Sequence, residues 1–377
     1  MRWRGSIALL CLASCAPSTP PSTPPSSPSQ AVATAAVTGR VTEAWIADGP
    51  TGRRAVRLTR DKRGAAEVTA APVGADANGN AQRELPFLWP PMIDSHVHLA
   101  YWDVADQLAA RGVLAAVDLS APLEAIDRLR AAPITVRYAG PMLTRPGGYP
   151  LDSWGADGYG IGCDAIACVD AAVADLARRG ASVIKLAMGK SGLAPQLVAP
   201  AVTAAHRAGL KVAVHALRDA EAALAAQAGC DLLAHTPVEP LSPATVRAWR
   251  GRAVISTLAA FGGGSATVEN LRQLRAAGAL VLYGTDLGNL RDAGPSAEEI
   301  ELLRKAGLDD AAITEAMTVA PARYWKVGAG AGLPGPMLLL AGDPRRSVRF
   351  LTAPRDVVKD VSGAGERATE SGEAGQP

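Results

Sequence analysis

The sequence predicts an α/β protein: a (β/α)₈ barrel of the TIM type, with a small β domain built from segments on both sides of the barrel. Beyond Pro90, short apolar runs typical of buried strands alternate with amphipathic helical runs. Several helical runs are followed directly by glycine, which readily takes the left-handed conformation that ends a helix. Eight such units match the closed barrel of parallel strands. An open doubly wound sheet is the alternative, but no G-x-G-x-x-G motif follows the first strand, which disfavours its dinucleotide-binding version.

The expected elements follow the order of the chain. The strands are residues 91–98, 113–120, 134–140, 182–188, 211–217, 231–237, 253–260 and 280–286. The helices are 103–111, 122–131, 169–179, 196–208, 219–228, 243–250 and 266–277. The glycines expected to end helices are Gly112, Gly180, Gly209, Gly229, Gly251 and Gly278.

The flanking segments have a different pattern. Short alternating stretches broken by Gly, Pro and Asn precede the barrel, and another strand-like run follows it. Segments 37–89 and 335–361 are therefore assigned to the small β domain, and 90–334 to the barrel. Residues 362–377 are rich in Gly and Glu and are expected to form a disordered tail.

The N-terminus has the layout of a secretory signal: a basic start followed by a short apolar stretch. Residues 12–15, Leu-Ala-Ser-Cys, resemble the lipobox of bacterial lipoproteins, which implies a signal peptide over 1–15 and a lipid on Cys15. An ordinary signal peptide with an incidental cysteine is the alternative. The Pro- and Ser-rich segment 16–36 reads as a linker. We therefore expect an exported protein, anchored by lipid on the periplasmic or cell-surface side of the bacterial membrane.

Composition excludes several classes of protein. The 377 residues carry 38 basic and 36 acidic side chains, a balance that argues against a nucleic-acid partner. No apolar run approaches 18 residues, so multiple membrane spans are excluded. Five cysteines are too few for a disulfide scaffold of this size. Cys163 and Cys168 are close enough in sequence to form a disulfide in an oxidising compartment; two separate reduced thiols are the alternative. The sequence specifies no oligomeric state.

Polar residues gather at the ends of the predicted strands, where barrel enzymes place their chemistry. His96 and His98 are two residues apart, so they share one face and can converge on one metal ion. Four other strand ends add His215, His235, Asp286 and, inside an apolar strand, Lys185. Each residue alone is weak evidence, because a histidine closing an apolar run is often a hydrogen-bonded core residue. The joint pattern predicts a metal site. His206 lies in a helical run and is interpreted as structural.

The sequence resembles the amidohydrolase superfamily, in its imidazolonepropionase-like and Xaa-Pro dipeptidase-like branch. The resemblance covers roughly residues 80–360. The matching pieces are 92–99 (MIDSHVHL), 181–186 (ASVIKL), 214–215 (VH), 234–235 (AH), 284–286 (GTD) and, as the family's closing helix, 317–323 (MTVAPAR).

The resemblance implies a role for each strand-end residue. In the family's binuclear form, His96, His98 and Asp286 hold the first ion. The second ion is held by His215 and His235. Lys185, carboxylated by carbon dioxide, bridges both ions. An unmodified structural lysine is the alternative.

The mononuclear form adds His215 to the first three ligands, and His235 then hydrogen-bonds the substrate carbonyl. The expected metal is Zn²⁺, with Mn²⁺, Fe²⁺ or Co²⁺ as alternatives. Asp286 is expected to take a proton from the attacking water and pass it to the leaving amine. The predicted function is hydrolysis of an amide or related C–N bond in a small molecule or dipeptide. The alternatives are a lactone or ester hydrolase on the same site, and a non-catalytic metal-binding surface lipoprotein.

The loop after the third strand, 145–164, is long and rich in Gly, Tyr and Trp. Barrel loops of this length usually carry function. Its candidate substrate contacts are Arg145, Tyr149, Trp154 and Tyr159. A glycine-rich surface loop without a binding role is the alternative.

Overall fold

The computed structural model describes residues 41–49, 51–60, 65–71, 85–332 and 335–362. The expected signal peptide with Cys15, the linker 16–36 and residues 363–377 of the expected tail lie outside the described residues. Ser362, the first residue of that expected tail, instead ends a strand. Within the described residues, no helix is long and apolar enough to cross a bilayer.

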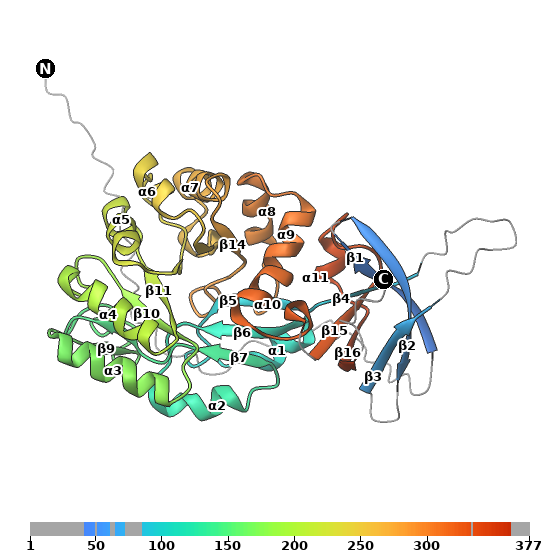
Figure 1. Ribbon diagram of the computed structural model, residues 1–377, viewed down its shortest axis with the longest axis horizontal. Helices are drawn as coiled ribbons and strands as arrows, with labels where there is room; N and C mark the ends of the chain where they lie inside the picture. Colours follow the sequence, from blue (N-terminus) through green and yellow to red (C-terminus); the bar gives the residue numbers. More distant parts are fainter. Residues whose placement is uncertain (1–40, 50, 61–64, 72–84, 333–334, 363–377) are drawn as a thin grey trace, which may run out of the picture.

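The larger part of the molecule contains two parallel sheets (Figure 1). One has the order β5-β6-β7, and the other the order β14-β13-β12-β11-β10-β8-β9. The strands of the first sheet are β5 (Met92–Val97), β6 (Val113–Asp118) and β7 (Thr135–Tyr138). Those of the second are β8 (Met142–Thr144), β9 (Gly160–Gly162), β10 (Val183–Ala187), β11 (Lys211–His215), β12 (Leu232–Leu233), β13 (Ala253–Ile255) and β14 (Leu280–Leu282).

Hydrogen bonds join the two sheets at both seams. The Ser95 amide of β5 donates to the Tyr283 carbonyl beyond β14 at 2.9 Å. At the other seam, the Ser182 amide before β10 donates to the Tyr138 carbonyl of β7, also at 2.9 Å. The α/β class is therefore confirmed and the arrangement is compatible with a TIM-type barrel, although the strand ladders form two sheets and not one closed ring.

All eight predicted strands are present, but β12, β13 and β14 end several residues earlier than expected. The chain turns sharply after the last two: Thr257, beyond β13, has φ +41°, and Asp286, beyond β14, has φ +57°. Residues in this left-handed region cannot continue a strand. The strand ends therefore become short loops that carry the polar side chains. The short strands β8 and β9 lie at the two ends of the predicted loop 145–164 and were not expected.

Helices alternate with the strands as predicted. They are α1 (Ala105–Ala110), α2 (Ile126–Arg130), α3 (Ile166–Arg178), α4 (Pro195–Arg207), α5 (Asp219–Ala228), α6 (Pro243–Ala248), α7 (Ser265–Ala276), α8 (Ala297–Lys305), α9 (Asp310–Met317), α10 (Val319–Trp325) and α11 (Arg349–Thr352). Three short 3₁₀ turns cover Leu123–Ala125, Ala259–Phe261 and Ala329–Ala331. The six glycines expected to follow helices all have positive φ, which confirms that prediction.

The expected closing helix 317–323 is wrong in one respect, because a break at Thr318 divides it between α9 and α10. Thr318 has φ −132° and ψ −79°. Its hydroxyl donates to the Thr314 carbonyl at 2.6 Å and accepts a hydrogen bond from Trp89 Nε1 at 3.1 Å. Trp89 is far from Thr318 in the sequence, so the local sequence pattern alone could not predict the break.

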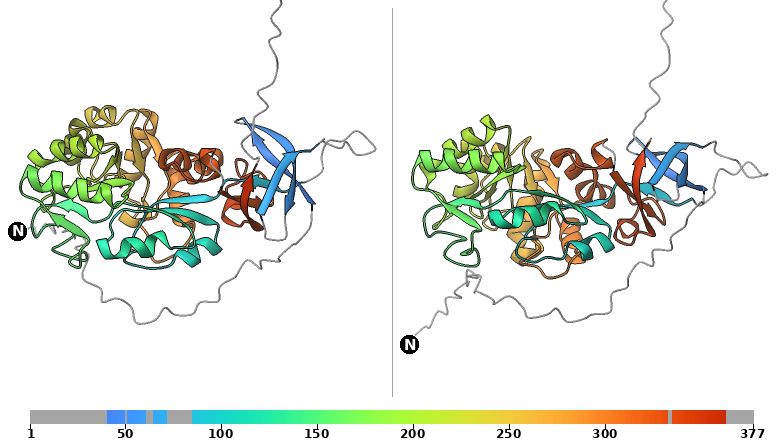
Figure 2. Two further views of the ribbon diagram at one scale, coloured as in Figure 1. Left: turned by 60° about the horizontal axis from the view of Figure 1, so that its bottom comes forward. Right: turned by 90° about the horizontal axis from the view of Figure 1, so that it is seen from below.

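Strands from both ends of the chain form a closed six-stranded β barrel, in the order β1-β2-β3-β16-β15-β4. It lies at one end of the molecule in all three views (Figures 1 and 2). Its strands are β1 (Val41–Asp48), β2 (Gly52–Arg60), β3 (Ala65–Ala70), β4 (Phe87–Trp89), β15 (Gly335–Leu340) and β16 (Asp356–Ser362). Its core contains Ala44, Val56, Leu58, Leu88, Met337 and Val358. Both segments assigned to the small β domain contribute strands to it.

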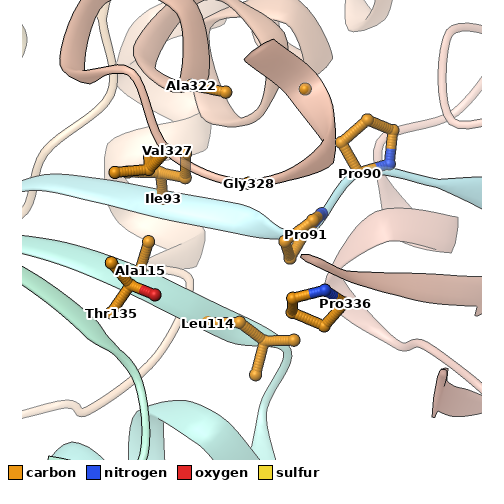
Figure 3. Close-up of a pocket in the computed structure, with 11 residues that line it drawn as sticks. Pro90, Pro91, Ile93, Leu114, Ala115, Thr135, Ala322, Val327, Gly328 and Pro336 are labelled. Atoms are coloured by element: carbon orange, nitrogen blue, oxygen red, sulfur yellow. The ribbon is translucent and has the colours of Figure 1, made fainter. Parts of the chain in front are cut away.

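A small hollow lies at the N-terminal ends of β5, β6 and β7, close to this β barrel (Figure 3). Apolar side chains line most of it, including Ile93, Leu114, Val327 and Pro336. None of the predicted site residues lines it. The chemistry must therefore be sought at the opposite ends of the same strands.

Candidate metal centre

Three predicted ligands meet at the carboxyl ends of β5 and β14. His96 Nε2 lies 3.3 Å from Asp286 Oδ1, and His98 Nε2 lies 3.1 Å from the same oxygen. One ligand atom from each of these residues lies within 4.8 Å of the others. All three side chains are buried, with at most 5% of each residue exposed. The geometry places two imidazoles and one carboxylate around a single point.

Unsatisfied polar atoms at this point fit a cation. His96 Nδ1 donates to the Ala234 carbonyl at 2.9 Å, which leaves Nε2 without a proton and with a free lone pair. His96 Nε2 and Asp286 Oδ1 are both buried, and neither forms a hydrogen bond. His98 Nδ1 is also buried without a partner. Buried polar atoms are normally hydrogen-bonded, so converging lone pairs without donors are the donor set that a divalent metal ion requires.

The other predicted residues surround this group. The His235 ring lies 4.5 Å from the His96 ring and 5.0 Å from the His215 ring. His235 Nδ1 is 3.9 Å from Asp286 Oδ2 and 3.2 Å from the Thr257 hydroxyl. Lys185, in β10, is 1% exposed and has no carboxylate of a described residue within 4.0 Å of its ammonium. The sequence therefore identified a real spatial cluster, of which His96, His98 and Asp286 are the tightest part.

At neutral pH, the local electrostatics favour the deprotonated forms of these side chains, which are the forms that can bind a metal ion. Burial lowers the pKa of Lys185 to about 7 and that of His215 to about 3. Burial also holds the pKa values of His96 and His235 well below their usual range. For Asp286, burial raises the pKa, but the neighbouring His96 and His98 outweigh it and hold the pKa well below its usual value. Neutral imidazoles beside an ionised carboxylate are the protonation states that metal binding needs.

Asp94 braces the two ligand-bearing strands, and the sequence reading missed it. Its Oδ1 accepts hydrogen bonds from the His96 amide at 3.1 Å and the Thr285 amide at 3.0 Å. Its Oδ2 accepts the Thr285 hydroxyl at 2.5 Å. These bonds join β5 to the residue before Asp286, across one seam of the sheets. Its place two residues before His96, on the same face of β5, was the signal that could have identified it.

Two further contacts fix the position of Asp286. Asn289 Nδ2 donates to Asp286 Oδ2 at 2.8 Å, which orients the carboxylate. At Gly284, a Cβ atom would lie 2.4 Å from Ile255 Cγ2 and 3.1 Å from the His96 amide nitrogen. Only glycine allows so close an approach of the two strands, and so brings Asp286 to the histidines.

The four predicted substrate contacts divide into two kinds. Tyr149 and Trp154 reach the histidines: Tyr149 lies 5.0 Å from the His215 ring, and Trp154 lies 5.1 Å from the His98 ring. Tyr159 is buried against Trp154, with ring centroids 5.3 Å apart. Arg145 is exposed, and its guanidinium has no hydrogen-bond or ion-pair partner among the described residues. Phe261, 4.8 Å from the His235 ring, was missed because it belongs to a different loop.

The base of this loop is cross-linked. Cys163, just after β9, forms a disulfide with Cys168 in the first turn of α3, with a Cα–Cα distance of 5.5 Å. The structure thus selects the paired alternative for these two cysteines. Cys230 is buried as a free thiol. The loop that carries Tyr149 and Trp154 is therefore tied to the helix that follows it.

The described fold recurs in solved structures of hydrolases. A Xaa-Pro dipeptidase with bound methionine aligns with a TM-score of 0.65 and 17% identity, over 85% of this chain and 98% of its own. An amidohydrolase aligns with a TM-score of 0.61 and 19% identity, over 86% and 98%. The ochratoxinase of A. niger aligns with a TM-score of 0.60 and 19% identity, over 85% and 94%.

The chain has the fold of these proteins. No family model matches it, and no curated protein matches it in sequence. At this level of identity, the likeness concerns the fold alone. The activity must be argued from the residues of the site.

Proposed function

We propose that this protein is a metal-dependent hydrolase of the amidohydrolase superfamily, and that it cleaves an amide or related C–N bond in a small molecule. The observation that carries the proposal is the pair of buried atoms without hydrogen-bond partners, His96 Nε2 and Asp286 Oδ1, inside a cluster of four histidines. The fold shared with an amidohydrolase and a dipeptidase supports the same class.

His96, His98 and Asp286 would hold a divalent cation. Two imidazoles and a carboxylate suit Zn²⁺, and they also accept Mn²⁺, Fe²⁺ or Co²⁺. When bound, such an ion would lower the pKa of water and polarise a carbonyl oxygen.

The side chains of the protein supply the remaining steps. Asp286 Oδ2, oriented by Asn289, takes the proton released by the attacking water and returns it to the leaving nitrogen. In the mononuclear form, where His235 binds no ion, its Nδ1 would accept the Thr257 hydroxyl and its Nε2 would donate a proton to the carbonyl oxygen of the substrate. Tyr149 and Trp154 cover the histidines and limit the access of bulk water.

A second ion is part of the proposal, and Lys185 is the reason. A buried ammonium without an ion pair is costly, and carboxylation removes that charge. The neutral amine attacks the carbon of carbon dioxide, so that a C–N bond forms while one C=O π bond breaks onto oxygen; the proton on nitrogen passes to water, and the product is an anionic carbamate. That carbamate would bridge the first ion to a second ion held by His215 and His235. Electron density that ends at the Lys185 amine in a metal-loaded crystal would instead favour the mononuclear form.

We also propose that the protein is exported and carries lipid on Cys15. The Cys163–Cys168 disulfide supports the first part, because disulfides persist in oxidising compartments. The intact mass of the mature protein tests both parts. A diacylated N-terminal Cys15 is expected, and an N-terminus that still contains Met1 would contradict the proposal.

The activity is tested by stripping the metal and restoring it. Protein treated with a chelator is reloaded with Zn²⁺ or Mn²⁺ and screened against N-acyl amino acids, dipeptides, cyclic amides, lactones and esters. Hydrolysis of a C–N substrate that disappears with the chelator and returns with the metal is expected. Activity on lactones or esters alone would favour the alternative reaction. A reloaded protein that hydrolyses none of these compounds would leave only a metal-binding role.

A further inference from the structure

We propose that this site accepts a neutral substrate with an aromatic ring beside the scissile bond. The inference rests on the proposed function, since it names the substrate class of the same site. It comes from aromatic side chains that face the histidines and from the charges around them.

Aromatic residues are rare in this chain, at 4% of the sequence, yet they gather at the histidines. Three histidines are each faced by one ring: His98 by Trp154 at 5.1 Å, His215 by Tyr149 at 5.0 Å, and His235 by Phe261 at 4.8 Å. Tyr149 and Trp154 belong to the loop between β8 and β9, whereas Phe261 follows β13. Rings from separate loops thus lie against one cluster of imidazoles. We call these three residues the aromatic wall.

The aromatic wall is supported from behind and remains partly open. Tyr101 lies 5.8 Å from Trp154, and Tyr159 packs on Trp154 from another side. Trp154 Nε1 donates to the Tyr149 hydroxyl at 3.2 Å, so the polar atom of the indole is already satisfied. Tyr149, Trp154 and Phe261 are each only partly buried. Partly exposed rings beside buried polar groups are typical of a pocket that receives an apolar ligand.

Under the proposed function Lys185 is carboxylated and carries no positive charge, and the arginines near the aromatic wall are paired elsewhere or exposed. Arg128 is bound to Asp103 and to the Ala100 carbonyl. Arg291 stacks on Trp102, outside the aromatic wall. Arg145 is exposed, and no contact between its guanidinium and a ring is found among the described residues. A substrate carboxylate would therefore meet rings and imidazoles in place of a paired guanidinium, which favours an uncharged substrate.

Binding of ketone isosteres tests the ring and the charge separately, without any need for turnover. The four probes are 3-benzoylpropionamide, 4-oxopentanamide, and the carboxylates of both, in which a CH₂ group replaces the nitrogen of an N-acylglycine. Calorimetry on the metal-loaded protein should give at least about tenfold tighter binding for the benzoyl amide than for its methyl counterpart. The carboxylates should bind no tighter than the amides.

Three variants locate the effect. Trp154→Leu should remove most of the preference for the ring, and Trp154→Phe should keep it because a ring remains. Trp102→Leu is the matched control, since Trp102 is also partly exposed but stacks on Arg291. Equal affinity for benzoyl and methyl probes, or an unchanged preference in Trp154→Leu, would overturn the inference. So would carboxylates that bind at least tenfold tighter than amides and lose this advantage in Arg145→Gln.

A parallel assay separates this inference from the proposed function. Hydrolysis of N-benzoylglycinamide and N-acetylglycinamide is measured on the same preparation. Ring-selective binding without hydrolysis of any C–N substrate would support the aromatic pocket and contradict the proposed reaction. Hydrolysis of both amides at equal efficiency, with no selective binding, would support the reaction and overturn the aromatic pocket.

Discussion

The two ends of the parallel strands differ in how they treat buried polar groups. At the carboxyl ends, two unbonded polar atoms, His96 Nε2 and Asp286 Oδ1, converge with His98 Nε2 on one point. At the amino ends, apolar side chains line the hollow beside the β barrel (Figure 3). Trp325 packs against β5, the strand that carries His96, and its Nε1 donates to the Ser95 hydroxyl at 3.2 Å.

The difference shows which buried polar atoms indicate function. The amino ends also bury two unbonded atoms, Arg137 Nε and Tyr324 OH, but these do not converge with other ligand atoms. Arg137 also donates from its terminal nitrogen to the Lys326 carbonyl at 2.8 Å. A single unsatisfied atom is a local cost of packing, whereas several acceptors facing one another require a ligand. The carboxyl ends should therefore control activity, and the amino ends should control stability.

Substitution of the proposed metal ligands at the carboxyl ends of the strands should have the largest effect on activity. The double variant His96→Ala/His98→Ala should lose hydrolysis by at least about 10³-fold, because the ion that activates water has lost two ligands. The variant should remain folded, which circular dichroism without added metal checks, but its melting temperature should fall because the hydrogen bond from His96 to the Ala234 carbonyl is lost. The control is His206→Ala, whose exposed ring is hydrogen-bonded to Asp231 at 2.8 Å. A double variant with normal turnover would refute the assignment of the site.

Substitution of a core residue at the amino ends of the strands should lower stability and leave metal binding unchanged. Trp325 is 5% exposed and packs with Ile93, Val117 and Leu282 under the strands. Trp325→Ala should lower the free energy of unfolding by about 3–5 kcal/mol, because it leaves a cavity. Denaturant titration measures that loss, and the metal content of the folded fraction should stay unchanged. Loss of metal without loss of stability would show that the two ends are not separable.

Some of this contrast could be read in the sequence. The histidines close apolar strands at regular positions, and a spacing of two residues fixes the shared face of His96 and His98. The aromatic wall could be predicted only in part, because Phe261 meets His235 through tertiary packing of separate loops. The break at Thr318 depends on a hydrogen bond from Trp89, 229 positions away. Local pattern thus predicted which residues end the strands, and long-range contacts decided what surrounds them.

A third prediction concerns pH and Glu299, which supports the loop between β13 and Phe261. Its carboxylate accepts hydrogen bonds from the amides of Leu258 at 3.0 Å and Ala259 at 2.7 Å, and burial raises its pKa from the ordinary 4.5 to about 7. The folded chain keeps a proton that the unfolded chain releases above pH 4.5, so the stabilising contribution is present at low pH and is lost as the pH rises towards 7. Each pH unit in this window costs at most about 1.4 kcal/mol.

Glu299→Gln should flatten this pH dependence, because the amide does not titrate. Urea titrations of both proteins at pH 5 and pH 7.5 give the comparison. Asp94, whose pKa burial also raises to about 7, is present in both proteins and so cancels in the difference. An equal slope in the two proteins would show that Glu299 does not hold its proton in the fold.

The smallest effect is expected at the disulfide. Cys163→Ser/Cys168→Ser should cost roughly 2 kcal/mol of stability, since the link closes a short loop of the unfolded chain. Limited proteolysis should cut the variant first between β8 and α3, next to the loop that carries Trp154. Unfolding and proteolysis profiles identical to those of the unaltered protein would mean that the link does not hold this loop.

The central claim is that the carboxyl ends of the strands hold a metal ion. It is tested most directly by counting the metal in protein that has been loaded and then dialysed. Elemental analysis should find at least one divalent ion per chain in the unaltered protein and in His206→Ala. It should find less than about a tenth of that in His96→Ala/His98→Ala, because two of the three tightest ligands are gone. A full complement of metal in the double variant, or no metal in the unaltered protein after loading, would contradict the claim.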